Sequence, residues 1–183
     1  AKVRRGEGGA AFAINAEKVV TYREDPEVRD LLRQGTLRYP DGAGVVLAMK
    51  KRGAKTARVP GADLWLAVLR SAAPHRTTAA LIGARSDVLA ETVRKIGTEM
   101  SHVAMGSPRQ EQIILELHDH WPSGYFMGLG GSFDVYCGRK RRAPLWMQQI
   151  GLEWLFRFLA EPSRAGRELK RLKFLALLVT GQV

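Results

Sequence analysis

The sequence predicts an α/β fold in which a mainly parallel sheet is flanked by helices, as in Rossmann-like domains, followed by a basic helical appendage. Short apolar runs that suit buried strands alternate with segments that carry apolar residues at helical spacing. A length of 183 residues with 45% hydrophobic side chains is sufficient for one such domain with a core of its own. The net charge of +11 is unevenly distributed, because ten Lys or Arg stand against three Glu from Arg139 onward.

The four predicted strands are short apolar runs bounded by turn-forming residues. They cover residues 10–14, 79–82, 102–105 and 125–129. In parallel sheets of this class, ligands bind beyond the carboxyl ends of the strands. The residues expected at those ends are Asn15, Gly83, Gly106 and Gly130. The turn at Gly128, Gly130 and Gly131 also lets backbone amides approach a ligand closely, because glycine has no Cβ.

Helices are predicted from their caps and their apolar spacing. Asp25 followed by Pro26 supplies an N-cap and a proline at the first helical position. Further helices are expected at residues 62–72, 86–95 and 109–118. Residues 39–42, Tyr-Pro-Asp-Gly, have the composition of a turn, and the run at 45–49 is a short helix or a strand.

The pattern predicts neither a metal site nor a cofactor. His118 and His120 are two residues apart and do not share a helical face. Cys137 is the one cysteine of the sequence, so it cannot form an intrachain disulfide. We expect no signal peptide, and the apolar run at residues 174–179 is far shorter than the roughly 20 residues of a membrane-spanning helix. Any contact with a membrane is therefore expected to be peripheral.

Two motifs are compatible with either a structural or a functional role. In the stretch from Gly106 to Glu111, Ser107 and Gln110 fit a capping box. The N-terminus of the helix that begins there also fits a phosphate-binding site. Asp41 fits a simple turn, but a carboxylate held beside a ligand could also act as a general base. The pattern alone leaves both alternatives open.

The basic tail combines cations with aromatic and aliphatic side chains. Arg157, Arg164 and Arg167 would share one face if the chain folds back after Pro162, which is expected to break the helix. A solvated basic face is the simpler interpretation. The interleaved apolar residues favour an interfacial helix instead. The side chains expected at that interface, beside Lys170, Arg171 and Lys173, are Phe174, Leu175, Leu177 and Leu178.

A series of ordered motifs extends from one end of the chain to the other. They are Phe-Ala-Ile-Asn-Ala-Glu-Lys at 12–18, Tyr-Pro-Asp-Gly at 39–42, Gly-Ala-Asp-Leu at 61–64, Val-Ala-Met-Gly-Ser-Pro-Arg-Gln-Glu at 103–111, Gly-Gly-Ser-Phe-Asp at 130–134, Arg-Ala-Pro at 142–144, and Gly-Leu-Glu-Trp-Leu-Phe-Arg at 151–157 followed by Glu-Pro-Ser-Arg at 161–164. In that order they resemble the WecG/TagA/CpsF glycosyltransferase family. The wording at 13–18 and 103–108 is most similar to the WecG branch.

This resemblance implies a UDP-sugar donor and an acceptor in which N-acetylglucosamine is linked to undecaprenyl diphosphate. The WecG branch transfers N-acetylmannosaminuronic acid in enterobacterial common antigen synthesis, and the TagA branch transfers N-acetylmannosamine in wall teichoic acid synthesis. The resemblance also implies a peripheral enzyme on the cytoplasmic face of the plasma membrane, at its anionic inner leaflet. Residues 1–144 would form the catalytic domain, and residues 145–183 an appendage that closes the active site.

The same resemblance assigns roles to individual residues. Asp41 is placed as the catalytic base of an inverting transfer. The residues expected to bind substrate are Asn15, Gln110, Asp134, Arg157, Arg164 and Arg167. We expect the reaction to need no metal, because no Asp-x-Asp motif is present and the arginines would neutralise the diphosphates.

The chain departs from the family at one junction. Relatives carry a further segment, with a Gly-Tyr-Phe motif and another helix, between the helix ending near Glu99 and the strand at Val103. Here Met100 is followed directly by Ser101, either through a natural deletion or because the sequence omits the segment. Omission is favoured, since the loss of a strand and a helix would expose the core of the sheet.

Two other classes of function compete with an enzyme. The net charge of +11 is compatible with a nucleic-acid-binding module, but no motif of that class is present, so no nucleic acid is expected as a partner. A non-catalytic membrane adaptor would need the basic tail but not Asp41. An oligomer is compatible with the sequence, which does not specify the number of subunits.

Overall fold

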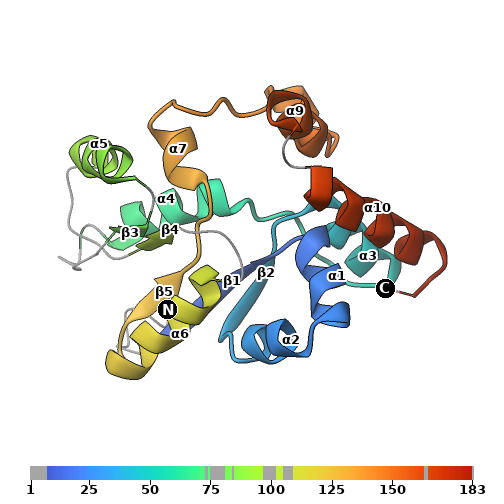
Figure 1. Cartoon of the computed structure of the whole chain (residues 1–183), viewed down its shortest axis with the longest axis horizontal. Helices are drawn as coiled ribbons and strands as arrows, with labels where there is room; N and C mark the ends of the chain where they lie inside the picture. Colours follow the sequence, from blue (N-terminus) through green and yellow to red (C-terminus); the bar gives the residue numbers. More distant parts are fainter. Residues whose placement is uncertain are drawn as a thin grey trace. The chain divides into compact units, whose positions relative to one another are not determined.

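The computed structural model describes residues 8–72, 74, 81–83, 85–96, 102–104, 109–162 and 165–182. The chain forms two compact units whose segments alternate along the sequence, as the colours of Figure 1 allow the reader to follow. Unit 1 contains Ala1–Ala13, Asp30–Tyr39 and Pro60–Lys140, and unit 2 contains Ile14–Arg29, Pro40–Val59 and Arg141–Val183. The chain therefore passes from unit 1 into unit 2 at the carboxyl ends of its first two strands.

Unit 1 is built on a three-stranded parallel sheet of order β2-β1-β5. Its strands are β1 (Gly9–Ile14), β2 (Leu37–Pro40) and β5 (Tyr125–Met127). The central strand β1 pairs in parallel with β5, which places Ala10 opposite Phe126. Residues 9–12 of β1 are buried, as expected of a strand that is covered on both faces. The predicted α/β class and the strands at 10–14 and 125–129 are confirmed.

A second parallel pair in unit 1 joins β3 (Leu81–Gly83) to β4 (His102–Ala104). These strands lie within or overlap the predicted runs at 79–82 and 102–105. The Met100–Ser101 junction that precedes β4 lies outside the described residues.

The predicted helices of unit 1 are confirmed, with one addition. They are α4 (Gly61–Ala72), α5 (Ser86–Ile96) and α6 (Arg109–His120). The addition is α7 (Ser132–Tyr136), which follows the glycine turn after β5. The fully buried Trp65 of α4 meets Phe133 and Tyr136 of α7 edge-on, with ring centroids 5.5 and 5.2 Å apart. This aromatic contact fixes the short helix α7 against α4.

Helix α2 (Pro26–Arg33) begins in unit 2 and ends in unit 1. The predicted start is confirmed, because the Asp25 carboxylate accepts hydrogen bonds from the amides of Glu27 and Val28 at 2.9 and 3.2 Å.

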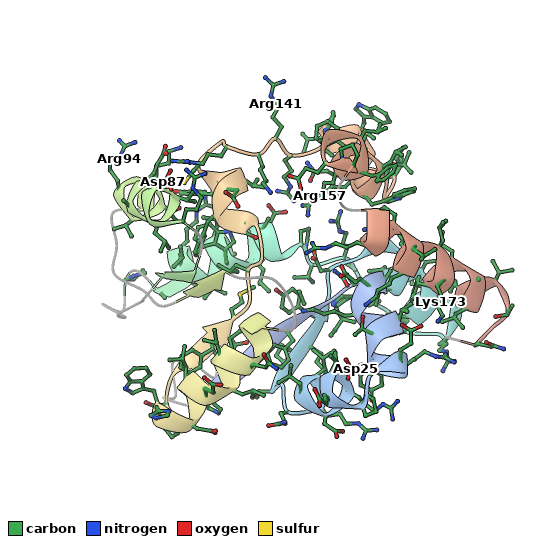
Figure 2. The ribbon with its side chains drawn as sticks, in the orientation of Figure 1. Asp25, Asp87, Arg94, Arg141, Arg157 and Lys173 are labelled. Carbon is green, nitrogen blue, oxygen red and sulfur yellow. The ribbon has the colours of Figure 1, made fainter. Side chains whose placement is uncertain are left out.

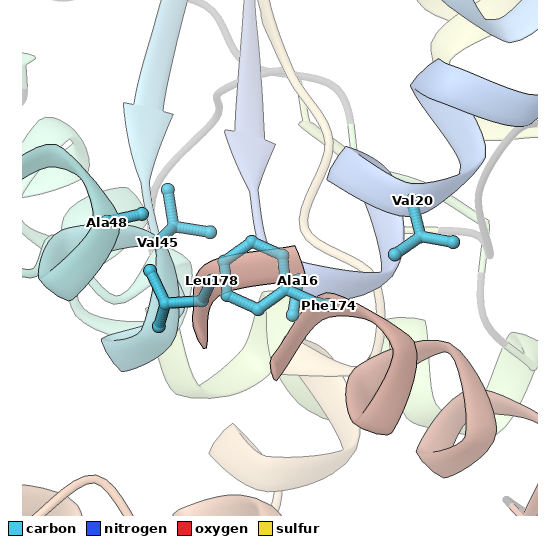
Figure 3. Packing of buried hydrophobic residues seen from close by; sticks show 6 residues of the cluster. All are labelled: Ala16, Val20, Val45, Ala48, Phe174 and Leu178. Carbon is cyan, nitrogen blue, oxygen red and sulfur yellow. The ribbon is translucent and has the colours of Figure 1, made fainter. Parts of the chain in front are cut away.

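The core of unit 2 lies between helices from both ends of the chain. The helices are α1 (Ala16–Glu24), α3 (Ala43–Lys51), α8 (Leu145–Gln149), α9 (Glu153–Ala160) and α10 (Ala165–Val179). Figure 3 shows the ring of Phe174 from α10 among side chains from α1 and α3. A Cβ on Gly44 would lie only 3.0 Å from Cε1 of that ring, so α3 carries a residue without a side chain where Phe174 packs. The buried cluster comprises Ala16, Val20, Val45, Ala48, Phe174 and Leu178.

The prediction that the apolar residues of the tail face an interface is wrong for Phe174 and Leu178. Phe174 is 0% exposed and Leu178 is 7% exposed. Leu177 is half-buried against the same cluster, and Leu175 alone of the four is exposed. The two buried residues are one helical turn apart, so they share the face of α10 that packs into unit 2.

Two cations predicted to face a membrane instead bind α1. The Lys170 ammonium donates a hydrogen bond to Oγ1 of Thr21 at 2.9 Å. Lys173 forms an ion pair with Glu24, one turn further along α1. Both lysines therefore link α10 to α1, and their contribution to a solvent-facing basic surface is reduced.

The third predicted cation, Arg171, joins α10 to α9. Its guanidinium pairs with Glu168 and lies over the Trp154 ring, 5.2 Å from the centroid. The predicted break at Pro162 is confirmed, because α9 ends at Ala160 and α10 begins at Ala165.

The sequence between β1 and α3 contains more regular structure than predicted. Helix α1 was not expected, and residues 39–40 belong to β2 instead of a turn. Tyr39 is buried, and Pro40 ends the strand, a position where its missing N–H is tolerated. Only residues 41–42 form the connection to α3, and the run at 45–49 is helical.

We predict that Phe174→Ala lowers the free energy of unfolding by about 3–5 kcal/mol, because it removes a fully buried ring and leaves a cavity. Urea denaturation followed by circular dichroism measures this. Leu172→Ala, on the exposed side of the same helix, is the matched control and should change stability by about 0.5 kcal/mol or less. Equal, small effects of the two substitutions would show that Phe174 is not part of the core.

Candidate active site

The candidate site begins where β1 and β2 end. Ile14 is the last residue of β1, and its carbonyl accepts hydrogen bonds from the amides of Asp41 and Gly42 at 2.9 and 3.4 Å. A Cβ on Gly42 would lie 3.3 Å from Cα of Asn15, so the two connections are in close contact. The structure therefore brings Asn15 and Asp41 together at the carboxyl ends of neighbouring strands, the position where ligands bind in this class of sheet.

Asn15 has a structural role at this point. It is the N-cap of α1, and its side-chain oxygen Oδ1 accepts a hydrogen bond from the amide of Lys18 at 2.9 Å. The N-terminal end of α1, which carries partial positive charge, therefore begins beside the Asp41 loop. Any substrate contact by Asn15 must be made by a side chain that is already oriented by the helix.

The Asp41 loop is also held by an arginine that the sequence analysis did not single out. Nε of Arg58 donates a hydrogen bond to the carbonyl of Asp41 at 2.6 Å. Nη2 of the same guanidinium donates to Oε2 of Glu153, at the start of α9, at 2.7 Å. Arg58 thus connects the loop of the candidate base to the C-terminal helices.

Glu153 is shared between two arginines. Its Oε1 accepts a hydrogen bond from Nη2 of Arg157 at 2.5 Å, while Oε2 is bound by Arg58. Glu153 is only 5% exposed. Each oxygen of this buried carboxylate therefore needs a hydrogen-bond donor, and each is bound by a charged guanidinium. Two guanidiniums against one carboxylate leave one net positive charge in this cluster.

Burial and charge act on the pKa of Glu153 in opposite directions. Desolvation by burial raises the pKa, whereas the charges of Arg157 and Arg58 and the hydrogen bonds from both guanidiniums lower it. The two arginines outweigh burial, so the pKa of Glu153 lies below its ordinary value and the side chain is ionised at neutral pH.

The predicted arginines of the tail do not form one continuous helical face. Arg157 lies on α9 and binds Glu153, whereas Arg167 lies on α10 with its Nε 3.8 Å from Oε1 of Glu17. Arg164 lies outside the described residues. Arg157 and Arg167 are both about half exposed, at 43% and 50% of their side-chain surface, so part of each guanidinium remains accessible to a ligand.

The other two predicted contact residues belong to unit 1. Asp134 lies in α7, directly after the glycine turn in which Gly130 has a φ of 54°, and its carbonyl accepts a hydrogen bond from the amide of Lys140 at 3.0 Å. Gln110 is the second residue of α6, but its side chain lies outside the part that the structure describes, as do Ser107 and Pro108. The choice between capping and phosphate binding there stays a prediction.

Potential metal ligands in the described part of the chain do not form a cluster. Within the described residues, His, Cys, Asp and Glu do not gather in any group of three or more that could hold a metal ion. Cys137 is buried in unit 1, with its Sγ 3.0 Å from Oγ1 of Thr92.

The arrangement in unit 2 suits acid–base chemistry on an anionic ligand. A half-buried carboxylate at the end of a parallel strand can accept a proton from a bound hydroxyl. The adjacent helix N-terminus and the arginine cluster favour negative charge, such as that of a phosphate. Sequence reasoning missed Arg58 and Glu153, although Glu153 lies inside the motif at 151–157.

The sequence matches a known protein family. The sequence model of the Glycosyl transferase WecG/TagA/CpsF family matches residues 1–103 and, in a second part, residues 89–183. Together the two parts span the chain. They overlap at residues 89–103, which include the Met100–Ser101 junction where a family segment was predicted to be missing.

The lowered pKa of Glu153 generates a prediction about acid stability. The ionised carboxylate stabilises the fold above the pKa of an unfolded glutamate, and this contribution is lost as the pH falls through the lower pKa of the folded state. Glu153→Gln should therefore melt well below the wild type at neutral pH, and the difference should shrink in acid.

Thermal melting at a series of pH values measures this difference. Asp30→Asn is the control, because Asp30 lies on the surface of α2 with 71% of its side chain exposed. That control should show a small difference at every pH. A difference between Glu153→Gln and wild type that stays constant from neutral to acid pH would contradict the assignment.

Proposed function

Because the chain belongs to the WecG/TagA/CpsF family of glycosyltransferases, we propose that it is an inverting transferase in which Asp41 is the general base. The family implies a sugar donor. The donor that we propose is UDP-N-acetylmannosaminuronic acid, or its neutral parent UDP-N-acetylmannosamine. The acceptor is N-acetylglucosamine on undecaprenyl diphosphate, as in enterobacterial common antigen synthesis. The family match across both parts of the chain carries this proposal.

The reaction is a single displacement. The acceptor hydroxyl attacks the anomeric carbon of the donor sugar, and a new C–O bond forms as the bond to UDP breaks. The bonding electron pair leaves with UDP, and the hydroxyl proton passes to the Asp41 carboxylate. Attack opposite to the leaving group inverts the anomeric configuration.

The position of Asp41 supports its role as base. The backbone amide of Asp41 is fixed by Ile14, and its carbonyl is fixed by Arg58. The loop is therefore held at both ends of the residue that carries the carboxylate. A base must lie within hydrogen-bonding reach of the proton that it removes, so a fixed backbone favours the reaction.

The arginines of the tail are proposed to stabilise the diphosphates. Arg157 and Arg167 lie in the same unit as Asp41 and are partly accessible, and Arg164 is assigned to the same role by the family motif. Guanidinium groups bind phosphate oxygens in a bidentate manner and offset the charge that develops on UDP as it leaves. Asn15, Gln110 and Asp134 are proposed to bind substrate, as the family motifs imply.

We further propose that residues 145–183 place the enzyme peripherally at the anionic, cytoplasmic face of the plasma membrane. In the described part of the chain, no helix has both the length and the apolar character needed to cross a bilayer. Large apolar side chains are nevertheless exposed along α8, α9 and α10. They are Leu145, Trp146, Ile150, Leu159, Leu169, Leu172, Leu175 and Val179.

This set replaces the interface that was predicted from the sequence. Trp146 is suited to the boundary between headgroups and acyl chains, and the leucines of α10 supply apolar area beside it. Figure 2 shows Arg141, a few residues before α8, extending away from the chain, where it can approach an anionic surface.

The role of Asp41 is tested by Asp41→Asn. This variant should keep its fold but lose transfer by roughly 10²–10⁴-fold, the usual contribution of a general base. Circular dichroism verifies folding, and release of UDP from the donor in the presence of a lipid-diphosphate-N-acetylglucosamine analogue measures transfer. Asp119→Asn, on the exposed end of α6, is the control and should be fully active. Near-normal turnover of Asp41→Asn would show that Asp41 is a residue of a simple turn and not the general base.

The membrane proposal is tested by combining Leu169→Ser with Leu172→Ser. Binding to vesicles that contain anionic phospholipid should weaken at least about tenfold, since a leucine removed from water contributes roughly 1.5–3 kcal/mol. Transfer to a water-soluble acceptor analogue should be unchanged. Trp121→Ser, which alters an exposed aromatic outside the tail, should affect neither measurement. If the leucine variant binds vesicles as the wild type does, this face of α10 does not contact the membrane.

A further inference from the structure

We propose that Arg58 and Glu153 are positioning residues that set the orientation of the Asp41 loop from the C-terminal helix α9. This inference rests on the proposed role of Asp41 as the general base. It goes beyond that role, because neither residue is required to contact the reacting atoms. Both act through the backbone of Asp41.

The connection consists of three hydrogen bonds in series. Arg157 binds one oxygen of Glu153 at 2.5 Å, and Arg58 binds the other at 2.7 Å. Arg58 then donates from Nε to the carbonyl of Asp41 at 2.6 Å. A helix from the end of the chain is thereby linked to a loop near its beginning, and every residue of the series lies in unit 2.

The geometry of Arg58 makes this connection directional. Nε and Nη2 lie on one edge of a planar guanidinium, so the Asp41 carbonyl and the Glu153 carboxylate are held in a fixed relation to each other. A lysine would keep the positive charge but has a single nitrogen on a flexible chain, and it could not hold both acceptors in this manner.

The carboxylate of Glu153 is the element that orders both arginines. Two guanidiniums near each other repel, and the buried negative charge between them offsets that repulsion. Glu153 is also the first residue of α9, so its position is fixed by the helix. Any change at Glu153 is therefore expected to reach Asp41 through Arg58.

The backbone contacts explain why this matters for the reaction. The Asp41 amide is bound by Ile14 and the Asp41 carbonyl by Arg58, so the peptide groups on both sides of its Cα are anchored. Loss of Arg58 would remove the shorter hydrogen bond to the second peptide group and leave the bond from the Gly42 amide to the Ile14 carbonyl at 3.4 Å, so the carboxylate would be oriented less firmly. A displacement of about 1 Å at a catalytic group can reduce the rate on the order of 100-fold.

A double-mutant cycle tests the inference. Arg58→Lys and Glu153→Gln are each made in the wild-type chain and in Asp41→Asn, and transfer is measured with UDP-N-acetylmannosaminuronic acid, UDP-N-acetylmannosamine and a lipid-diphosphate-N-acetylglucosamine analogue. In the wild-type chain each substitution should lower turnover on the order of 10–100-fold. In the Asp41→Asn chain, where no base remains to be positioned, each should have a further effect of roughly twofold or less.

Matched controls separate positioning from loss of fold. Arg38 also donates hydrogen bonds to backbone carbonyls, those of Leu32 and Arg33, but it lies in unit 1, so Arg38→Lys should leave turnover unchanged in both chains. Thermal melting identifies the folded variants. If Glu153→Gln does not fold, Arg58→Lys, which keeps the charge balance, provides the cycle by itself.

The outcomes distinguish this inference from the proposed function. If the substitutions lower turnover by the same factor with and without Asp41, or do not lower it at all, the positioning role is wrong while the base assignment can stand. If Asp41→Asn itself transfers normally, the base assignment fails first. If the substitutions lower turnover only in chains that contain Asp41, both the positioning role and the base assignment are supported.

Discussion

The carbonyl of Ile14 accepts hydrogen bonds from the amides of Asp41 and Gly42, and the arrangement of unit 2 depends on this junction. It joins the carboxyl ends of β1 and β2, so that α1, capped by Asn15, begins beside the Asp41 loop. Helix α1 in turn packs against α10, with Phe174 in the shared core (Figure 3). The first and last parts of the sequence are therefore components of one packed unit around the candidate base.

The positive charge of the tail is distributed by the same arrangement. Lys170 and Lys173 bind groups on α1, and Arg157 binds Glu153. The sequence predicted that the lysines would face an anionic surface. In the structure, part of the positive charge of the tail is instead bound to groups within the protein. A related contact connects the tail to the Asp41 loop, because Glu153 at the start of α9 binds Arg58, which binds the Asp41 carbonyl. Membrane contact, as proposed, then depends more on exposed leucines than on these lysines.

The sequence predicted the elements whose signals are local. Buried apolar runs identified β1 and β5, and the Asp25–Pro26 pair identified the start of α2. Helix α1 and strand β2 were missed because their polar residues obscure the spacing of apolar residues that is typical of helices and strands. Strand β2 also lies at the edge of its sheet and ends in proline. Helix α10 is apolar on more than one side, so spacing alone could not show that Phe174 is buried and Leu172 exposed. The Arg58–Glu153 contact joins residues 95 positions apart, and no local pattern encodes such a pair.

We propose that this chain transfers a sugar from a UDP donor with inversion at the anomeric carbon. Nuclear magnetic resonance of the product formed from each UDP-sugar and a lipid-diphosphate-N-acetylglucosamine analogue tests it most directly. We expect that UDP release requires the acceptor and that the new glycosidic bond has the opposite anomeric configuration to the donor. Release of UDP that does not depend on acceptor, or a product that retains the donor configuration, would contradict it.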